Sequence, residues 1–215
     1  MSSGGFPLDK FIKISYRELA YNYIKDKVWS FQYRPGDKIS IASIAQGLNI
    51  SNTPVREALS LLESEGLVET VPFTGPRVVT FTEEELYQHR IGTVALYLGC
   101  YNMCSYLNLT SALIENYEAA LQKQIELPED AETIHQVEIS TAVDYSFVRT
   151  LENKTISNMG RVSLNVGRLE SYFDYEKGKR TKRSSVEEHQ AILQALKEND
   201  FKKIKKAILT HYHFE

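Results

Sequence analysis

The chain has 215 residues, of which 42% are hydrophobic, and it carries 25 Lys and Arg against 28 Asp and Glu. This length and apolar content allow one small and one larger domain, and they exclude a disordered or fibrous chain. Residues 1–77 hold 9 basic against 8 acidic residues, whereas residues 78–215 hold 16 against 20. The first part is therefore about +1 and the second about −4, which is compatible with a basic face on the first domain but does not prove a nucleic-acid partner.

Targeting and membrane signals are not visible in the sequence. The segment Met1–Pro7 is rich in Ser and Gly and lacks a basic n-region and an apolar h-region, so we expect a flexible tail and not a signal peptide. No apolar run approaches the length of a membrane span. Cys100 and Cys104 lie four residues apart in a helical pattern, which favours buried free thiols over a disulfide. We expect a cytoplasmic protein that does not bind membranes.

The first predicted element is a helix over residues 15–32, whose apolar positions recur at steps of three and four residues. The turn Tyr33–Gly36 ends it, and a second, shorter helix follows with Ile44, Ala45 and Leu48 on one face. Asn49 breaks that helix. The pattern predicts a small helical domain that begins well before the motif described next.

A helix-turn-helix is indicated by the polar joint after Asn49. Ser51, Asn52 and Thr53 precede Pro54, and capping groups beside a proline that is tolerated in a first turn mark a new helix start. This helix ends at Gly66 and buries one stripe, made of Val55, Ala58, Leu59 and Leu62. The stripe leaves Asn52, Thr53 and Arg56 exposed on its first turns, where a recognition helix faces a major groove.

A β-hairpin is predicted after Gly66, with strands over Leu67–Phe73 and Arg77–Phe81 and a turn at Thr74, Gly75 and Pro76. As the wing of a winged helix-turn-helix, it would bring Arg77 beside a phosphate or into a minor groove. The alternative is an ordinary hairpin that covers a small helical core. Arg34 and Lys38 are further candidates for phosphate contacts, with plain surface solvation as their alternative.

This stretch resembles the DNA-binding domain of the GntR family of bacterial transcription regulators over roughly residues 15–80. The family joint usually reads Ser-Arg-Thr-Pro-Val-Arg-Glu-Ala-Leu, and residues 51–59 read Ser-Asn-Thr-Pro-Val-Arg-Glu-Ala-Leu. Asn52 stands where the family has Arg, and Ala42 stands where relatives carry a basic group. Loss of a cation weakens phosphate attraction, while Asn can pair with adenine, so an altered operator is expected. The implied DNA-binding residues are Arg34, Lys38, Ser51, Asn52, Thr53, Arg56, Thr74, Gly75 and Arg77.

From Thr82 onward the pattern is helical throughout. Thr82 followed by three glutamates is a helix start with acid in its first turn. Apolar stripes then run over residues 86–101, 113–125, 139–151, 159–173, 186–196 and 201–212. We therefore predict a mainly α protein with a winged helix-turn-helix at residues 10–81 and an all-α antiparallel bundle of about six helices at residues 82–215.

Three polar side chains are expected inside this bundle. His189 and His211 recur at helical spacing with apolar neighbours, and Asp144 lies one step from the stripe of Val143 and Phe147. A lone inward histidine is usually a hydrogen-bonded core residue. Together, however, the three residues predict a polar pocket.

The second part resembles the FCD effector-binding domain that accompanies GntR domains, of the shorter vanillate-regulator-like type. Its usual pattern is Asp, a His four residues later, a Glu-His pair, and a last His about 22 residues on. Asp144, Glu188 with His189, and His211 fit this pattern, but Val148 replaces the first His. The resemblance implies Zn, Ni or Mn held by Asp144, His189 and His211, or a metal-free pocket in which the histidines and Arg90 or Arg161 bind a carboxylate effector.

The sequence therefore predicts a homodimeric regulator of transcription, expected to be a repressor, that binds double-stranded operator DNA under control of a small-molecule effector. The bundle would also provide dimerisation. An enzyme is not expected, because no nucleophile or base motif accompanies the three polar residues. The alternative is a dimeric regulator that works without a ligand and has a degenerate pocket. The basic run at residues 177–183 is interpreted as a solvated loop.

Overall fold

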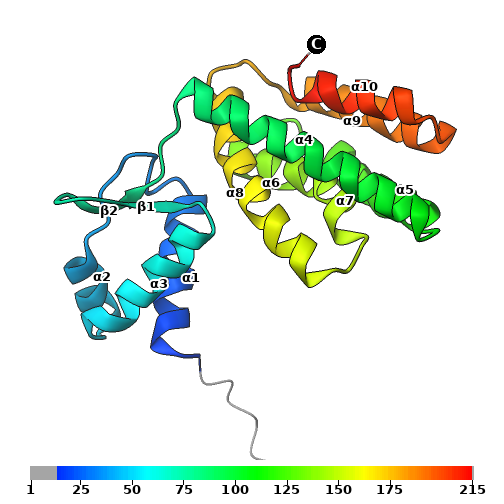
Figure 1. Ribbon diagram of the computed structural model, residues 1–215. Coiled ribbons are helices and arrows are strands. Elements are labelled where there is room, and N and C mark those ends of the chain that lie inside the picture. Colours follow the sequence, from blue (N-terminus) through cyan, green and yellow to red (C-terminus); the bar gives the residue numbers. More distant parts are fainter. Residues whose placement is uncertain (1–13, 215) are drawn as a thin grey trace, which may run out of the picture. The chain divides into compact units, whose positions relative to one another are not determined.

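The computed structural model describes residues 14–214, which form ten helices and one two-stranded antiparallel sheet (Figure 1). The chain divides into two compact units, one comprising the residues up to 64 together with 68–78, and the other comprising 65–67 together with 79–214. The predicted mainly helical fold is confirmed. The segment Met1–Pro7, predicted to be a tail, lies outside the described residues.

The first unit begins with three helices, α1 (Tyr16–Trp29), α2 (Ile41–Leu48) and α3 (Asn52–Ser64). Ser40 caps α2 by accepting a hydrogen bond from Ser43 N, and Asn49 ends it with φ of 54°, a left-handed conformation that asparagine tolerates. The buried stripe of α3 is Val55, Ala58, Leu59 and Leu62, as the sequence predicted. The helix-turn-helix thus arises from local capping signals and one apolar face.

The hairpin is shorter than predicted and turns at a different place. Its strands are β1 (Val68–Val71) and β2 (Gly75–Val78), and Val71 pairs with Gly75 across a turn at residues 72–74. The prediction of a turn at Thr74–Pro76 was therefore wrong. The Pro76 carbonyl accepts a hydrogen bond from Ile39 N at 2.9 Å, so the far side of β2 is bonded to the segment before α2. This pairing draws Gly75 and Pro76 into the sheet, although both are typical turn residues.

The second unit contains α4 (Glu83–Tyr106), α5 (Thr110–Glu126), α6 (Thr133–Asp144), α7 (Ser146–Arg149), α8 (Lys154–Glu176), α9 (Lys182–Glu198) and α10 (Phe201–His211). Thr82 and Glu85 form a capping box at the start of α4. Aromatic rings occupy the centre of the core, where Tyr97 stacks on Phe147 with ring centroids 5.5 Å apart. Among the described residues, no helix has the length and apolar character that crossing a bilayer requires.

The third helix predicted in this unit is broken in two at Tyr145. Thr141 Oγ1 donates to the carbonyl of Val137 at 2.8 Å, and Thr150 Oγ1 donates to the carbonyl of Ser146 at 2.8 Å. Hydroxyls that bond back to the preceding turn in this way bend helices. The break leaves Asp144 as the last residue of α6 and places the single turn α7 against α8.

The contact of α7 with α8 depends on a glycine. A Cβ atom added to Gly160 would lie 2.9 and 3.0 Å from the two methyl groups of Val148. Gly160→Ala should therefore destabilise the protein, because overpacking costs about 1–3 kcal/mol and the better helix propensity of alanine returns only about 1 kcal/mol. The measurement is urea unfolding followed by far-UV circular dichroism.

Gly167 provides the matched control on the same helix, since a Cβ atom there meets nothing within 4 Å. Gly167→Ala should stabilise the protein by up to about 1 kcal/mol. Val148→Ala combined with Gly160→Ala should recover much of the loss. A Gly160→Ala variant as stable as Gly167→Ala would contradict this account.

Candidate DNA interface and effector site

The exposed end of α3 is the first candidate site. Asn52, Thr53 and Arg56 are exposed on its first two turns, Ser51 immediately precedes it, and the opposite face is buried in the unit. A helix held in this way presents a short row of hydrogen-bonding side chains while its own core contacts stay intact. The structure therefore brings together the residues that the sequence predicted for base contact.

The hairpin and the strand beside it carry the remaining candidates. Thr74 is exposed at the turn, and Gly75 begins β2 with φ of 92°. Arg77 Nε lies 2.9 Å from Glu69 Oε1 across the hairpin, and their side chains are 34% and 36% exposed. Lys38 forms an isolated bridge to Arg77, which places both cations on the same sheet.

Arg34 is exposed in the loop that leads to this sheet, where its backbone N–H donates to Asp37 Oδ2 at 2.8 Å. Ala42, which stands where relatives carry a basic group, is exposed on α2. The cations near α3 and the hairpin are thus Arg34, Lys38, Arg56 and Arg77, a set suited to phosphate and base contacts.

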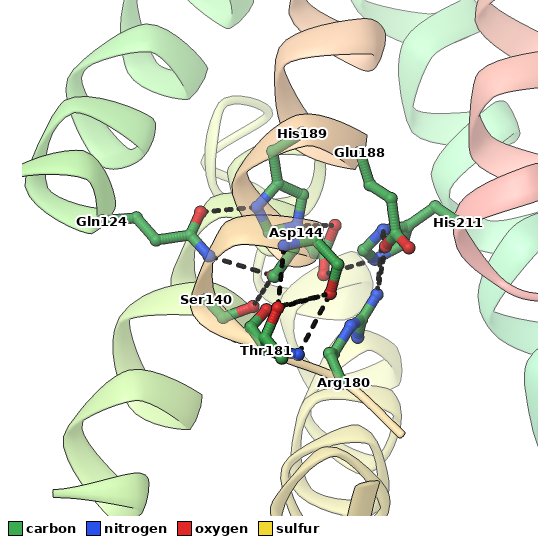
Figure 2. Close-up of polar contacts among 10 residues, drawn as sticks. Gln124, Ser140, Asp144, Arg180, Thr181, Glu188, His189 and His211 are labelled. Carbon is green, nitrogen blue, oxygen red and sulfur yellow. Dashed lines mark hydrogen bonds and ion pairs between the residues drawn. The ribbon is translucent and has the colours of Figure 1, made fainter. Parts of the chain in front are cut away.

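The second candidate site is a buried cluster of Asp144, His189 and His211 (Figure 2). One potential metal-ligating atom from each residue lies within 4.8 Å of the others. Asp144 Oδ1 is 3.4 Å from His189 Nε2, and Asp144 Oδ2 is 3.2 Å from His211 Nε2. The ends of α6, α9 and α10 therefore converge on one carboxylate, as the inward spacing of these residues predicted.

Outer partners fix the orientation of both imidazoles. His189 Nδ1 lies 2.6 Å from Gln124 Oε1, and the Gln124 amide nitrogen donates to Ser185 Oγ at 3.0 Å. An amide oxygen only accepts, so Nδ1 carries the proton of a neutral His189 and Nε2 directs a lone pair toward Asp144. Within the described residues, His189 Nε2 has no hydrogen-bond partner. A buried lone pair that faces a carboxylate calls for a cation between them.

His211 has a comparable arrangement. Its Nδ1 lies 2.8 Å from Glu188 Oε2, while its Nε2 faces Asp144. Burial lowers the pKa of both histidines. For His189 the net pKa stays below its usual value, whereas for His211 the attraction of Asp144 and Glu188 raises the pKa above it. Without a metal, the cluster therefore holds a protonated His211 between two carboxylates.

The carboxylates respond in the opposite direction. Burial acts to raise the pKa of Asp144, but His211 and His189 hold it well below its ordinary value. Burial also acts on Glu188, and its bonds to His211 and Arg180 bring its pKa down to about 2. Both carboxylates are thus ionised near neutral pH, and a cation that enters the cluster meets negative charge.

Arg180 is a residue of this site that the sequence analysis missed. The basic run at residues 177–183 was interpreted as a solvated loop, but the Arg180 side chain is only 11% exposed and forms an ion pair with Glu188. Its Nη2 also lies 3.2 Å from His211 Nδ1. Arg180 directly precedes Thr181, the N-cap of α9, so no apolar periodicity marked it as buried.

A cavity of about 40 Å³ adjoins the cluster. Arg90 lines it, and Arg90 Nε lies 3.6 Å from Glu170 Oε1, with both side chains 17% exposed. Arg161 does not lie among the residues that line the cavity. It forms an ion pair with Glu65 at 3.2 Å and donates to Asn158. The structure therefore brings Arg90, but not Arg161, to the pocket with Asp144 and His211.

Val148 lies fully buried on α7, with its methyl groups toward Gly160. A valine offers no ligand atom. The three polar residues nevertheless fit a divalent metal in donor chemistry, because two imidazoles and a carboxylate suit Zn, Ni and Mn, and because each imidazole has an outer partner on Nδ1. The orphaned Nε2 of His189 is the specific observation in favour of this fit.

A winged helix-turn-helix unit joined to a helical unit with a buried charged pocket defines a DNA-binding regulator of transcription. Comparisons agree with this class. Residues 17–78 match the model "Bacterial regulatory proteins, gntR family", and residues 104–214 match the FCD domain. The chain belongs to the GntR family and carries an FCD effector-binding domain. The names of its relatives are those of transcriptional regulators and not of enzymes.

Among these relatives, the uncharacterized HTH-type transcriptional regulator YdhC of Bacillus subtilis is 25% identical over 98% of this chain and 92% of its own. The Nta operon transcriptional regulator of Aminobacter aminovorans is 41% identical, but over 21% of this chain and 22% of its own. A solved putative transcriptional regulator GntR from Rhodococcus sp. RHA1 has a TM-score of 0.68 at 15% identity, covering 92% of this chain and 94% of that chain. The solved structure confirms the fold.

Proposed function

We propose that this regulator is a repressor that binds its operator as a homodimer in the cytoplasm and is controlled by a small carboxylate effector in its helical domain. The observation that carries the proposal is the buried cluster of Asp144, His189 and His211 beside Arg180. A bundle used only for dimerisation has no need to bury these charges, whose desolvation is costly. The proposed domains are residues 10–81 for DNA binding and 82–215 for effector binding and dimerisation.

The proposed DNA contacts divide by chemistry. Asn52, Thr53 and Arg56, with Ser51 before them, face base edges in a major groove. Arg34, Lys38, Thr74, Gly75 and Arg77 lie near the phosphate backbone. Since Asn52 replaces the arginine of the family, it can accept from and donate to one adenine, and the operator should differ at that position from those of relatives.

The proposed metal ligands are Asp144, His189 and His211. A bound Zn, Ni or Mn ion would supply a Lewis-acid attraction for a carboxylate. Because Val148 gives no ligand, the three protein groups leave room for an oxygen donor from outside. Gln124 and Glu188 hold the imidazoles by their Nδ1 atoms, so that both Nε2 atoms remain free to face this position.

The proposed anion contacts are Arg180 and Arg90. Arg180 can bind an effector carboxylate only by sharing the guanidinium that Glu188 now holds, and Glu188 is also the partner of His211. Effector binding is therefore linked to the orientation of α10 through one glutamate. A cavity of about 40 Å³ holds little more than ordered water, so an effector must displace the loop between α8 and α9 as it enters.

A second function is favoured by that small cavity and by Val148, namely a dimeric regulator that works without a ligand. Two measurements separate the proposals. Footprinting of the purified protein on DNA selected from the promoters of its source organism should show protected half-sites, and no protection at modest ionic strength would refute the regulator. Thermal shift against metals and small carboxylates should then raise Tm for an effector, whereas no shift with any of them favours the ligand-independent regulator.

A further inference from the structure

The tip of the hairpin carries an aromatic side chain that nothing covers in the described structure. Phe73 is 112% exposed, more than any other large apolar side chain among residues 14–214, and Tyr106 follows at 79%. It lies between β1 and β2, in the turn that Thr74 N closes by donating to the carbonyl of Val71 at 3.1 Å. The ring therefore projects from the end of the wing.

The backbone at this position is also unfavourable for a bulky residue. Phe73 has φ of 61°, in the left-handed region that glycine and asparagine adopt most readily. Phe31 has φ of 52°, but it is only half-exposed and packing offsets the strain. No packing offsets the strain at Phe73, and residues held in such conformations without internal compensation cluster at binding sites.

The neighbours of the tip suit nucleic acid. Arg77 lies on β2, and Lys38 is bridged to it on the adjacent segment, so the base of the hairpin carries cations while its apex carries an apolar ring. Cations at the base can contact phosphates on either side of a groove. A phenyl ring reads no hydrogen-bonding pattern, but apolar side chains that enter a minor groove insert between base pairs and kink the duplex.

We propose that Phe73 is a wedge that inserts from the minor groove between two base pairs of the operator, unstacking them and bending the DNA. This inference rests on the DNA-binding part of the proposed function. Pyrimidine–purine steps such as TA and CA unstack most easily, so the operator should carry one of them at the position of each wing. Phe73 thereby contributes to specificity through DNA deformability, without a direct base contact.

The test uses the full-length protein and an operator selected by it from a random-sequence pool, with 2-aminopurine placed at successive steps. Wild type should increase 2-aminopurine fluorescence at one step per half-site and bend the duplex, as measured by energy transfer between its ends. Phe73→Leu should retain both effects, since leucine also acts as a wedge. Phe73→Ala and Phe73→Gly should lose both and bind about tenfold more weakly, which corresponds to about 1.4 kcal/mol.

Two controls make the result specific. Tyr106→Ala removes another highly exposed ring and should leave bending and affinity unchanged. The melting temperature of Phe73→Ala should equal that of wild type or exceed it, because the ring makes no packing contact to lose. Bending and fluorescence equal to wild type in Phe73→Ala would overturn the proposal, and a changed oligomeric state with unchanged bending would show that the ring binds protein instead. If wild type selects no sequence at all, the regulator proposal fails first.

Discussion

Arg56→Ala is expected to abolish sequence-specific operator binding and leave weak, salt-dependent DNA binding. Arg56 is exposed on the second turn of α3, where its guanidinium can pair with both acceptors of one guanine. Such a contact contributes about 1–3 kcal/mol at each half-site. A dimer makes it twice, so the variant should lose roughly 30-fold to 10⁴-fold in affinity for the operator.

Two comparison variants distinguish base recognition from charge. Arg149→Ala removes an exposed arginine from α7 in the second unit and should bind the operator as wild type does. Lys38→Ala should weaken binding about equally for operator and random DNA and reduce the salt slope by about one. Fluorescence anisotropy titrations on both DNAs at several salt concentrations provide these values. An Arg56→Ala protein that is folded, dimeric and still selective for the operator would remove α3 from the recognition surface.

The winged unit could be predicted from the sequence because its signals are local. Ser40, Asn49 and Pro54 mark helix boundaries by capping and steric rules that hold within one turn of chain. The hairpin turn was misplaced because Gly75 and Pro76 satisfy local turn rules, whereas their pairing with Ile39 depends on a segment more than 30 residues earlier. Long-range hydrogen bonds are not visible in a local pattern.

The buried cluster shows a similar division. Asp144, His189 and His211 could be predicted because they stand on apolar stripes of helices. Gln124 and Arg180 could not, since a polar residue on a helix and a cation in a basic loop are normally solvated. Their burial follows from the pairing of charges once the helices have packed. The exposure of Phe73 was likewise hidden, because the sequence placed it at the end of a strand and not at the tip of the wing.

Asp144→Asn is expected to abolish stoichiometric metal binding. Asp144 contributes the one carboxylate among the three proposed ligands, and both imidazole Nε2 atoms face it at 3.2 and 3.4 Å. An amide oxygen is a much weaker ligand for Zn, Ni or Mn and carries no charge to balance the ion. Wild type purified without chelators should contain about one metal per chain by mass spectrometry, and the variant should contain only traces.

Variants of the outer residues grade the effect. Gln124→Ala frees the Nδ1 atom of His189 and should weaken metal affinity by roughly 10-fold to 100-fold, as outer-shell losses do. Glu187→Ala removes an exposed acid next to Glu188 and should leave the affinity unchanged. Calorimetric titration of chelator-stripped protein with ZnCl₂ measures both, and His189→Gln provides a second ligand variant should Asp144→Asn fold poorly.

The pH dependence of that titration provides an independent check. In the metal-free protein the pKa of His211 is raised by Asp144 and Glu188, so the stabilisation that its protonation provides is complete below the unfolded pKa of about 6.5 and is lost as pH rises through the higher folded value. A metal must displace the Nε2 proton, and its apparent affinity should therefore increase with pH over that window. Affinity independent of pH, or metal retained by Asp144→Asn, would show that the ion binds elsewhere. A metal-free wild type would leave Arg180, His211 and Arg90 as a site for the carboxylate alone.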